Sequence, residues 1–85
     1  MKPKARVKIY TASYCGFCHR AIDYLEENNV EFENIDVTND PKTRESASEK
    51  AGGFSTVPLI FIDDKFIGGC SELLRFPDIQ KLAAE

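Results

Sequence analysis

The sequence contains no apolar run long enough to cross a membrane as a helix. It also has no excess of basic residues: 11 Lys and Arg are set against 14 Asp and Glu, and the net charge of −3 argues against a nucleic-acid-binding protein. The lysines and arginine near the N-terminus are not followed by an apolar segment of the kind that secretory signals carry. We therefore expect no secretory signal, no membrane contact and a cytoplasmic location.

Cysteine is scarce, and its count of three is odd. A secreted domain held together by disulfides would more often have four or six cysteines, so we interpret these thiols as reactive rather than structural. The 85 residues are enough for one domain spanning 1–85, and no repeat, linker or low-complexity tract divides them.

Two of the thiols, Cys15 and Cys18, form a C-x-x-C motif between a short apolar strand pattern and a helical pattern. This placement predicts that Cys15 lies at the start of a helix, where free backbone N–H groups and the helix dipole favour a thiolate. The thiolate is the nucleophilic form of cysteine, and Cys18 is close enough in sequence to form a disulfide with it. A C-x-x-C motif beside a βαβ pattern indicates thioredoxin-like redox chemistry.

The hydrophobic pattern predicts the element order β-α-β-α-β-β-α, with the first two strands parallel and the last two forming a hairpin. The second helix has only two apolar residues, both alanines, and we expect it to cover the sheet thinly. The fold class is therefore α/β: a thioredoxin fold with a four-stranded mixed sheet flanked by helices. The predicted strands are 7–11, 31–37, 59–62 and 65–67, and the predicted helices are 15–28, 41–51, and one that Ser71 caps and Pro77 breaks near residue 76, followed by a short segment to 84.

Other interpretations of the cysteines are open at this point. They could be buried structural thiols. The string Cys15 to His19 also matches the C-x-x-C-H haem-attachment pattern, and Cys15, Cys18, His19 and Cys70 could together be considered as zinc ligands. A second C-x-x-C or C-x-x-H pair, which a closed zinc site usually has, is missing, and His19 alone is most simply a surface residue.

Over nearly its whole length the chain resembles the glutaredoxins, above all the small bacterial dithiol members. The resemblance rests on three motifs at their usual separations, together with the Cys18–Ala21 and Ile67–Cys70 runs. The motifs are Tyr14-Cys15-Gly16-Phe17-Cys18, Thr56-Val57-Pro58 and Gly68-Gly69-Cys70-Ser71-Glu72.

The resemblance implies that Cys15 is the catalytic nucleophile and Cys18 the resolving thiol. It implies a glutathione site in which Pro58 is a cis proline facing the cysteines and Val57 pairs with the tripeptide through its backbone. The remaining glutathione-binding residues that it implies are Tyr14, Phe17, Thr56, Gly69, Cys70 and Ser71, with Arg44 as a candidate for the glycine carboxylate.

The chain departs from the family pattern at three positions. Ala12 stands where many members have a basic residue, and Ser71 stands where many have aspartate, so we expect weaker electrostatic binding of glutathione. Gly16 stands where dithiol members commonly have proline, which loosens the start of the helix.

The expected function is that of an enzyme, a glutathione-dependent thiol–disulfide oxidoreductase, with glutathione as reductant. Its expected partners are glutathionylated or disulfide-containing proteins, and we expect a monomer. One alternative, suggested by Gly16, is a carrier that shares a glutathione-ligated [2Fe–2S] cluster between two subunits. Another is an electron donor reduced by thioredoxin reductase that supplies ribonucleotide reductase.

Overall fold

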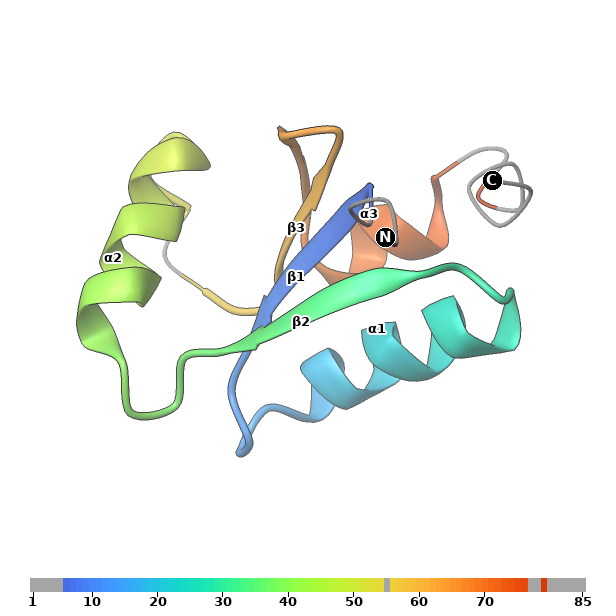
Figure 1. The fold of residues 1–85 in the computed structure, drawn as a ribbon, viewed down its shortest axis with the longest axis horizontal. Helices are drawn as coiled ribbons and strands as arrows, with labels where there is room; N and C mark the ends of the chain where they lie inside the picture. The colour runs from blue at the N-terminus through green and yellow to red at the C-terminus, as the bar shows by residue number, and fades with distance from the viewer. Residues whose placement is uncertain (1–5, 55, 77–78, 80–85) are drawn as a thin grey trace, which may run out of the picture.

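The computed structural model describes residues 6–54, 56–76 and 79. Its elements follow the predicted order, and helices lie on both sides of a central sheet (Figure 1). They are β1 (Val7–Thr11), α1 (Gly16–Glu27), β2 (Phe32–Asp36), α2 (Pro41–Lys50), β3 (Leu59–Ile62), β4 (Lys65–Gly68) and α3 (Cys70–Leu74). The predicted bounds of β1 and β3 are confirmed, and those of β2, β4, α1 and α2 are correct to within one residue at each end.

The four strands lie in the order β2-β1-β3-β4. As predicted, β1 is parallel to β2, with Val7 opposite Phe32 and Thr11 opposite Asp36. The β3–β4 pair is the predicted antiparallel hairpin. Its turn residues Asp63 and Asp64 have φ values of 52° and 67°, which is the backbone conformation that a tight two-residue hairpin requires. The sheet is therefore the mixed sheet of a thioredoxin fold.

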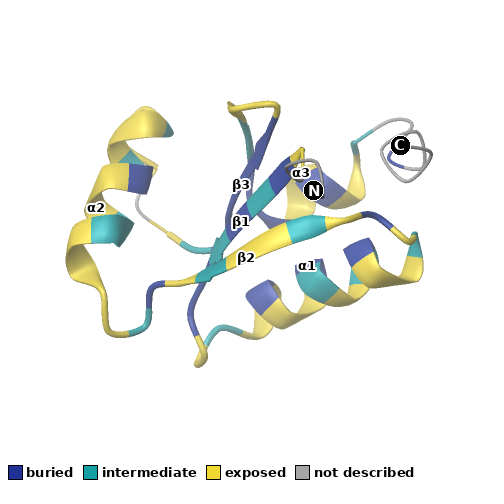
Figure 2. Cartoon of the chain, in the orientation of Figure 1, coloured by how far each residue is buried: buried dark blue, intermediate teal, exposed yellow. Residues whose placement is uncertain are grey.

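The main core lies between the sheet and helices α1 and α3. Alternate residues of β1 point to this side, because successive side chains of a strand face opposite ways. The apolar stripe of α1 covers them, and Figure 2 shows its buried residues turned towards the sheet. The fully buried members of this core are Val7, Ile9, Ala21, Leu25, Ile60 and Leu73.

Helix α2 covers the opposite face, and it covers it thinly, as predicted. Of its residues, all of which are described, Ala47 alone is buried, and it packs with Leu59 and Phe61. The helix begins as expected, with the Asp40 side chain accepting a hydrogen bond from the Thr43 N–H at 3.2 Å and Pro41 in the first turn. It ends at a turn in which Gly52 and Gly53 have positive φ.

The start of α3 differs from the prediction. Ser71 does not cap this helix: the capping residue is Gly69, and the carboxylate of Glu72 accepts a hydrogen bond from the Gly69 N–H at 2.7 Å. A glutamate at the third helical position that accepts from the N–H of the capping residue is one half of a capping box. The predicted break at Pro77 and the segment to residue 84 lie outside the described residues.

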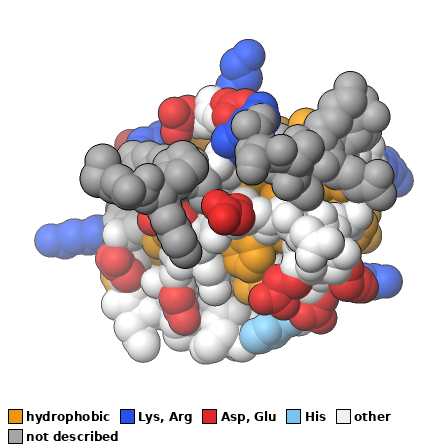
Figure 3. Space-filling view, turned by 45° about the vertical axis from the view of Figure 1, so that its right-hand side comes forward, with side chains coloured by type: hydrophobic (Ala, Val, Ile, Leu, Met, Phe, Trp, Pro, Cys, Tyr) orange, Lys and Arg blue, Asp and Glu red, His pale blue; other side chains and the backbone are white. Residues whose placement is uncertain are grey.

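The outer surface carries many acidic side chains. On the face shown in Figure 3 they surround a small exposed apolar patch, in keeping with the net charge of −3. No helix in the described part of the chain is long and apolar enough to span a membrane.

Candidate active site

Cys15 lies in the turn that connects β1 to α1. Its N–H donates to the carbonyl oxygen of Ala12 at 3.1 Å, and its extended backbone makes it the capping residue of α1. The Cys18 N–H donates to Cys15 Sγ at 3.1 Å. A backbone donor aimed at the sulfur, together with the positive end of the helix dipole, stabilises negative charge there. The prediction that Cys15 lies at a helix start is therefore confirmed.

Cys18 has a very different environment. Its side chain is 1% exposed, and burial raises the pKa of its thiol to about 12, with a further contribution from its hydrogen bond to Cys15. The cysteines are free thiols in this structure. The half-buried Cys15 receives a backbone N–H, whereas the buried Cys18 keeps its proton. Cys15 is therefore the sulfur better suited to attack a disulfide.

The loop before β3 lies opposite the cysteines. The Val57–Pro58 peptide bond is cis, as predicted, and the Cys15 thiol donates to the Val57 carbonyl oxygen at a distance of 3.7 Å. The backbone of this loop therefore runs directly past the reactive sulfur. Gly69 approaches the same loop from the start of α3: a Cβ atom at Gly69 would lie 3.4 Å from the carbonyl oxygen of Pro58.

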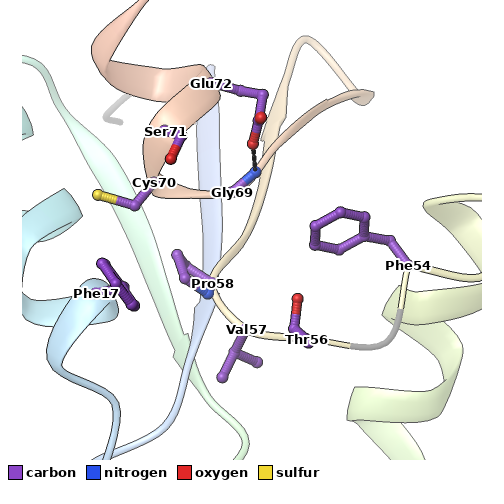
Figure 4. Close-up of a pocket in the computed structure, with 9 residues that line it drawn as sticks. All are labelled: Phe17, Phe54, Thr56, Val57, Pro58, Gly69, Cys70, Ser71 and Glu72. Carbon is purple, nitrogen blue, oxygen red and sulfur yellow. Dashed lines mark hydrogen bonds between the residues drawn. The ribbon is translucent and has the colours of Figure 1, made fainter.

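A pocket of about 180 Å³ opens between this loop, α1 and the start of α3 (Figure 4). Most of the predicted site residues meet here. Its lining consists of Phe17, Phe54, Thr56, Val57, Pro58, Gly69, Cys70, Ser71 and Glu72. Cys70 is buried, which raises the pKa of its thiol, whereas Ser71 is exposed.

Phe54 and Glu72 are pocket residues that the sequence analysis did not predict. Phe54 lies against Phe66, with 5.2 Å between the ring centroids, and forms the wall on the α2 side. An aromatic residue between the Gly52-Gly53 turn and the Thr-Val-Pro motif was its sequence signal. The signal for Glu72 was its spacing of three residues from Gly69, which is the spacing of a side chain that caps a helix start.

Tyr14 and Arg44 lie together at the surface. Tyr14 is 68% exposed and Phe17 is 62% exposed, so aromatic side chains flank Cys15 on the solvent side. Arg44 Nη1 donates to the Tyr14 hydroxyl at 3.0 Å, which places this arginine of α2 beside the turn that carries Cys15. Arg44 belongs to a second hollow, on α2, with Pro41, Glu45 and Ser48, rather than to the pocket of Figure 4.

The other interpretations of the cysteines can be examined on this geometry. Among the described residues, no three His, Cys, Asp or Glu side chains are grouped as metal ligands would be. His19 is exposed, as expected, and its Nε2 lies 3.2 Å from the Ser13 carbonyl oxygen rather than near Cys15 Sγ. Within the described region of one chain, Cys15 is the one cysteine that is partly accessible. One accessible thiol is not by itself a ligand set for zinc or for an iron–sulfur cluster.

Comparisons with known proteins agree with this geometry. The glutaredoxin family model matches residues 7–67. A probable glutaredoxin of Synechocystis is 39% identical over 82 residues, covering 96% of this chain and 93% of the relative. Glutaredoxin 3 of Escherichia coli is 41% identical over 69 residues, covering 81% of this chain and 82% of the relative.

A solved glutaredoxin structure also resembles this chain. The glutaredoxin of Brucella melitensis superposes with a TM-score of 0.73 and 36% identity, covering 94% of this chain and 86% of that chain. The fold, the C-x-x-C motif and these relatives together establish a thiol–disulfide oxidoreductase. The chain belongs to the glutaredoxin family.

Proposed function

We propose that this protein uses glutathione to reduce glutathione mixed disulfides and protein disulfides in the cytoplasm, with Cys15 as the nucleophile. The observation that carries the proposal is the position of Cys15 Sγ. It receives the Cys18 N–H at 3.1 Å and is partly exposed, whereas Cys18 is buried. A thiolate that is stabilised and reachable is what attack on a disulfide requires.

Glutathione suits the pocket because the tripeptide has a backbone, an ammonium group and two carboxylates. Its backbone can pair with Val57 as an added strand pairs with a sheet edge. The carboxylate of Glu72 lines the pocket and offers a partner of opposite charge for the γ-glutamyl ammonium. Thr56, Gly69, Cys70 and Ser71 would surround the tripeptide. Arg44 lies outside this pocket, beside Tyr14, and would take the glycine carboxylate where that end of the tripeptide extends past Tyr14.

The reaction proceeds by two exchanges. The Cys15 thiolate attacks the glutathione sulfur of a mixed disulfide, the Cys15–glutathione disulfide forms, and the substrate leaves as a thiolate that takes up a proton. A second glutathione, as its thiolate, then attacks the glutathione sulfur bound to Cys15. This releases oxidised glutathione and restores the Cys15 thiolate. In the net reaction, one free glutathione and one mixed disulfide give the substrate thiol and one oxidised glutathione, and the enzyme is unchanged.

Cys18 provides the alternative second step, in which its thiolate attacks Cys15 and expels glutathione. Burial raises the pKa of Cys18, and so do the hydrogen bond and negative charge of Cys15. The last two causes disappear when Cys15 is in a mixed disulfide, but burial remains. We infer that attack by glutathione is the faster second step for glutathionylated substrates. For protein disulfides, we infer that Cys18 attacks the mixed disulfide between Cys15 and the substrate protein and so releases that protein.

The test is reduction of a glutathione mixed disulfide coupled to glutathione reductase. Cys15→Ser should abolish turnover, whereas Cys18→Ser should keep it, because the second glutathione can still complete the cycle. Thermal melts of both variants show whether the fold is intact. Turnover by a folded Cys15→Ser variant would refute the assignment of the nucleophile.

Changing the reductant tests glutathione dependence separately. We expect turnover with glutathione and its reductase and none with thioredoxin reductase alone. The opposite pattern would leave the oxidoreductase in place but refute glutathione as its reductant.

A further inference from the structure

The loop that precedes Cys15 is held by a hydroxyl and a carboxylate that lie outside the three family motifs. The N–H of Ser13 donates to Thr38 Oγ1 at 2.8 Å, and the Ser13 hydroxyl oxygen lies 3.3 Å from the same atom. The Thr38 hydroxyl in turn donates to Asp36 Oδ1 at 2.5 Å. The chain of hydrogen bonds thus runs from the Ser13 backbone through Thr38 to Asp36.

The Asp36 end of this series of hydrogen bonds is held in the sheet. Asp36 is the last residue of β2 and lies opposite Thr11 in the parallel pairing. The next residue, Val37, donates its N–H to the Thr11 carbonyl oxygen at 2.8 Å. The Thr38 N–H also donates to Asp36 Oδ1 at 2.8 Å, so the carboxylate orients both the backbone and the hydroxyl of Thr38. These hydrogen bonds from Thr38 lower the pKa of Asp36 and keep it an acceptor at neutral pH.

At its other end, this series of hydrogen bonds fixes the loop that carries the Cys15 sulfur. Ser13 lies within the turn that the Cys15 N–H closes on the Ala12 carbonyl. Because Ser13 is fixed, the turn has little freedom to rotate, and the direction of the Cys15 Cα–Cβ bond is fixed with it. That direction aims Sγ at the Cys18 N–H and the Val57 carbonyl.

We propose that Thr38, supported by Asp36, is a positioning residue that holds the loop before Cys15 in the geometry that makes its sulfur reactive. Thr38 hydrogen-bonds Ser13 rather than the sulfur, so it acts through the loop. The inference rests on Cys15 being the reactive thiol and does not require that glutathione is the co-substrate.

Alkylation of Cys15 by iodoacetamide tests the proposal without any substrate, with mass spectrometry to locate the modified cysteine. Thr38→Val keeps the shape of the side chain and removes the hydroxyl. We expect its alkylation rate at 25 °C and pH 7 to fall about three- to tenfold, the range that loss of one hydrogen bond to the loop implies. Thr38→Ser restores the hydroxyl and should recover the wild-type rate.

Thr43→Val is the matched control. Thr43 donates its hydroxyl to Asp40 Oδ2 at 2.7 Å and its N–H to Oδ1 of the same carboxylate, so the pair has the same chemistry at the start of α2. These two hydrogen bonds lie within the start of α2 and do not involve Ser13. We expect Thr43→Val to lower the melting temperature and to leave the alkylation rate of Cys15 unchanged.

The outcomes separate positioning from general stability. Equal rates for Thr38→Val and wild type would overturn the proposal, as would an equal loss of rate in Thr43→Val. If Thr38→Val does not fold, Asp36→Asn replaces it, because the amide keeps the shape of the carboxylate and removes its charge. A smaller loss of rate is then expected, and a wild-type rate would overturn the proposal equally.

Discussion

The buried proton of Cys18 should make the stability of this protein fall at alkaline pH. The pKa of the Cys18 thiol is raised to about 12 from 9.0, chiefly by burial. An unfolded Cys18 ionises near pH 9, whereas the folded residue keeps its proton. Between these values the unfolded state binds fewer protons than the native state, so the free energy of unfolding decreases as pH rises. Below pH 9 both states are protonated and the effect vanishes.

The magnitude follows from the two pKa values. At pH 10 the folded thiol is still almost wholly protonated, while about nine-tenths of the unfolded thiol is ionised. One pH unit above the unfolded pKa corresponds to about 1.4 kcal/mol of unfolding free energy. We therefore expect the Cys18 thiol to remove on the order of 1 kcal/mol between pH 8 and pH 10.

Urea unfolding at pH 8 and pH 10, in the presence of a reductant, measures this loss, and Cys18→Ser isolates the contribution of the thiol. Serine has nearly the same shape and does not ionise in this range. Groups that lie away from Cys18 contribute equally to both proteins and cancel in the comparison. Equal losses in wild type and Cys18→Ser would refute the conclusion that the fold keeps Cys18 protonated.

Two further changes test particular contacts. Gly68→Ala should destabilise the fold by about 1–3 kcal/mol in urea unfolding, because Gly68 has a φ of 126° and a Cβ atom there would collide with the Glu72 side chain. Gly16→Ala, with nothing within 4 Å of the added atom, should be neutral or slightly stabilising, and an equal loss in both variants would count against the steric reason. Tyr14→Phe removes the acceptor for Arg44 and should raise the KM for a glutathione mixed disulfide about two- to fivefold at unchanged kcat. Tyr24→Phe on the core side of α1 should leave KM unchanged, and an unchanged KM for Tyr14→Phe would separate Arg44 from substrate binding.

The sequence predicts the elements of this fold well because its patterns are local. The continuous run Leu59–Ile62 has every residue buried, and it could only be an inner strand. The Asp40-Pro41 pair determines the start of α2 by itself. The start of α3 was misplaced because two residues compete for the capping role. The Glu72 carboxylate reaches the Gly69 N–H, which leaves the Ser71 hydroxyl exposed.

The site could be predicted only in part, since its residues come together through tertiary contacts. The three motifs identify Cys15, Val57, Pro58 and the start of α3. The fold brings Val57, Pro58 and the start of α3 to one pocket, and Cys15 lies beside it, with its sulfur 3.7 Å from the Val57 carbonyl oxygen. Phe54 was missed because its place depends on the glycine turn after α2 and on its contact with Phe66. The hydrogen bond from the Ser13 N–H to Thr38 Oγ1 joins residues 25 positions apart, and no local pattern predicts it.

The thin attachment of α2 has a consequence for the range of substrates. Ala47 is the one fully buried side chain that α2 packs on the sheet, and burying one methyl group is worth only about 0.8 kcal/mol. Phe54 follows the helix after the Gly52-Gly53 turn and rests on Phe66, so we expect this wall of the pocket to yield more readily than the others. The opposite wall, formed by α1 and α3, is part of the main core and keeps its place. We therefore expect the pocket to accept disulfides of different bulk on the side of α2, while Cys15 keeps its place at the start of α1.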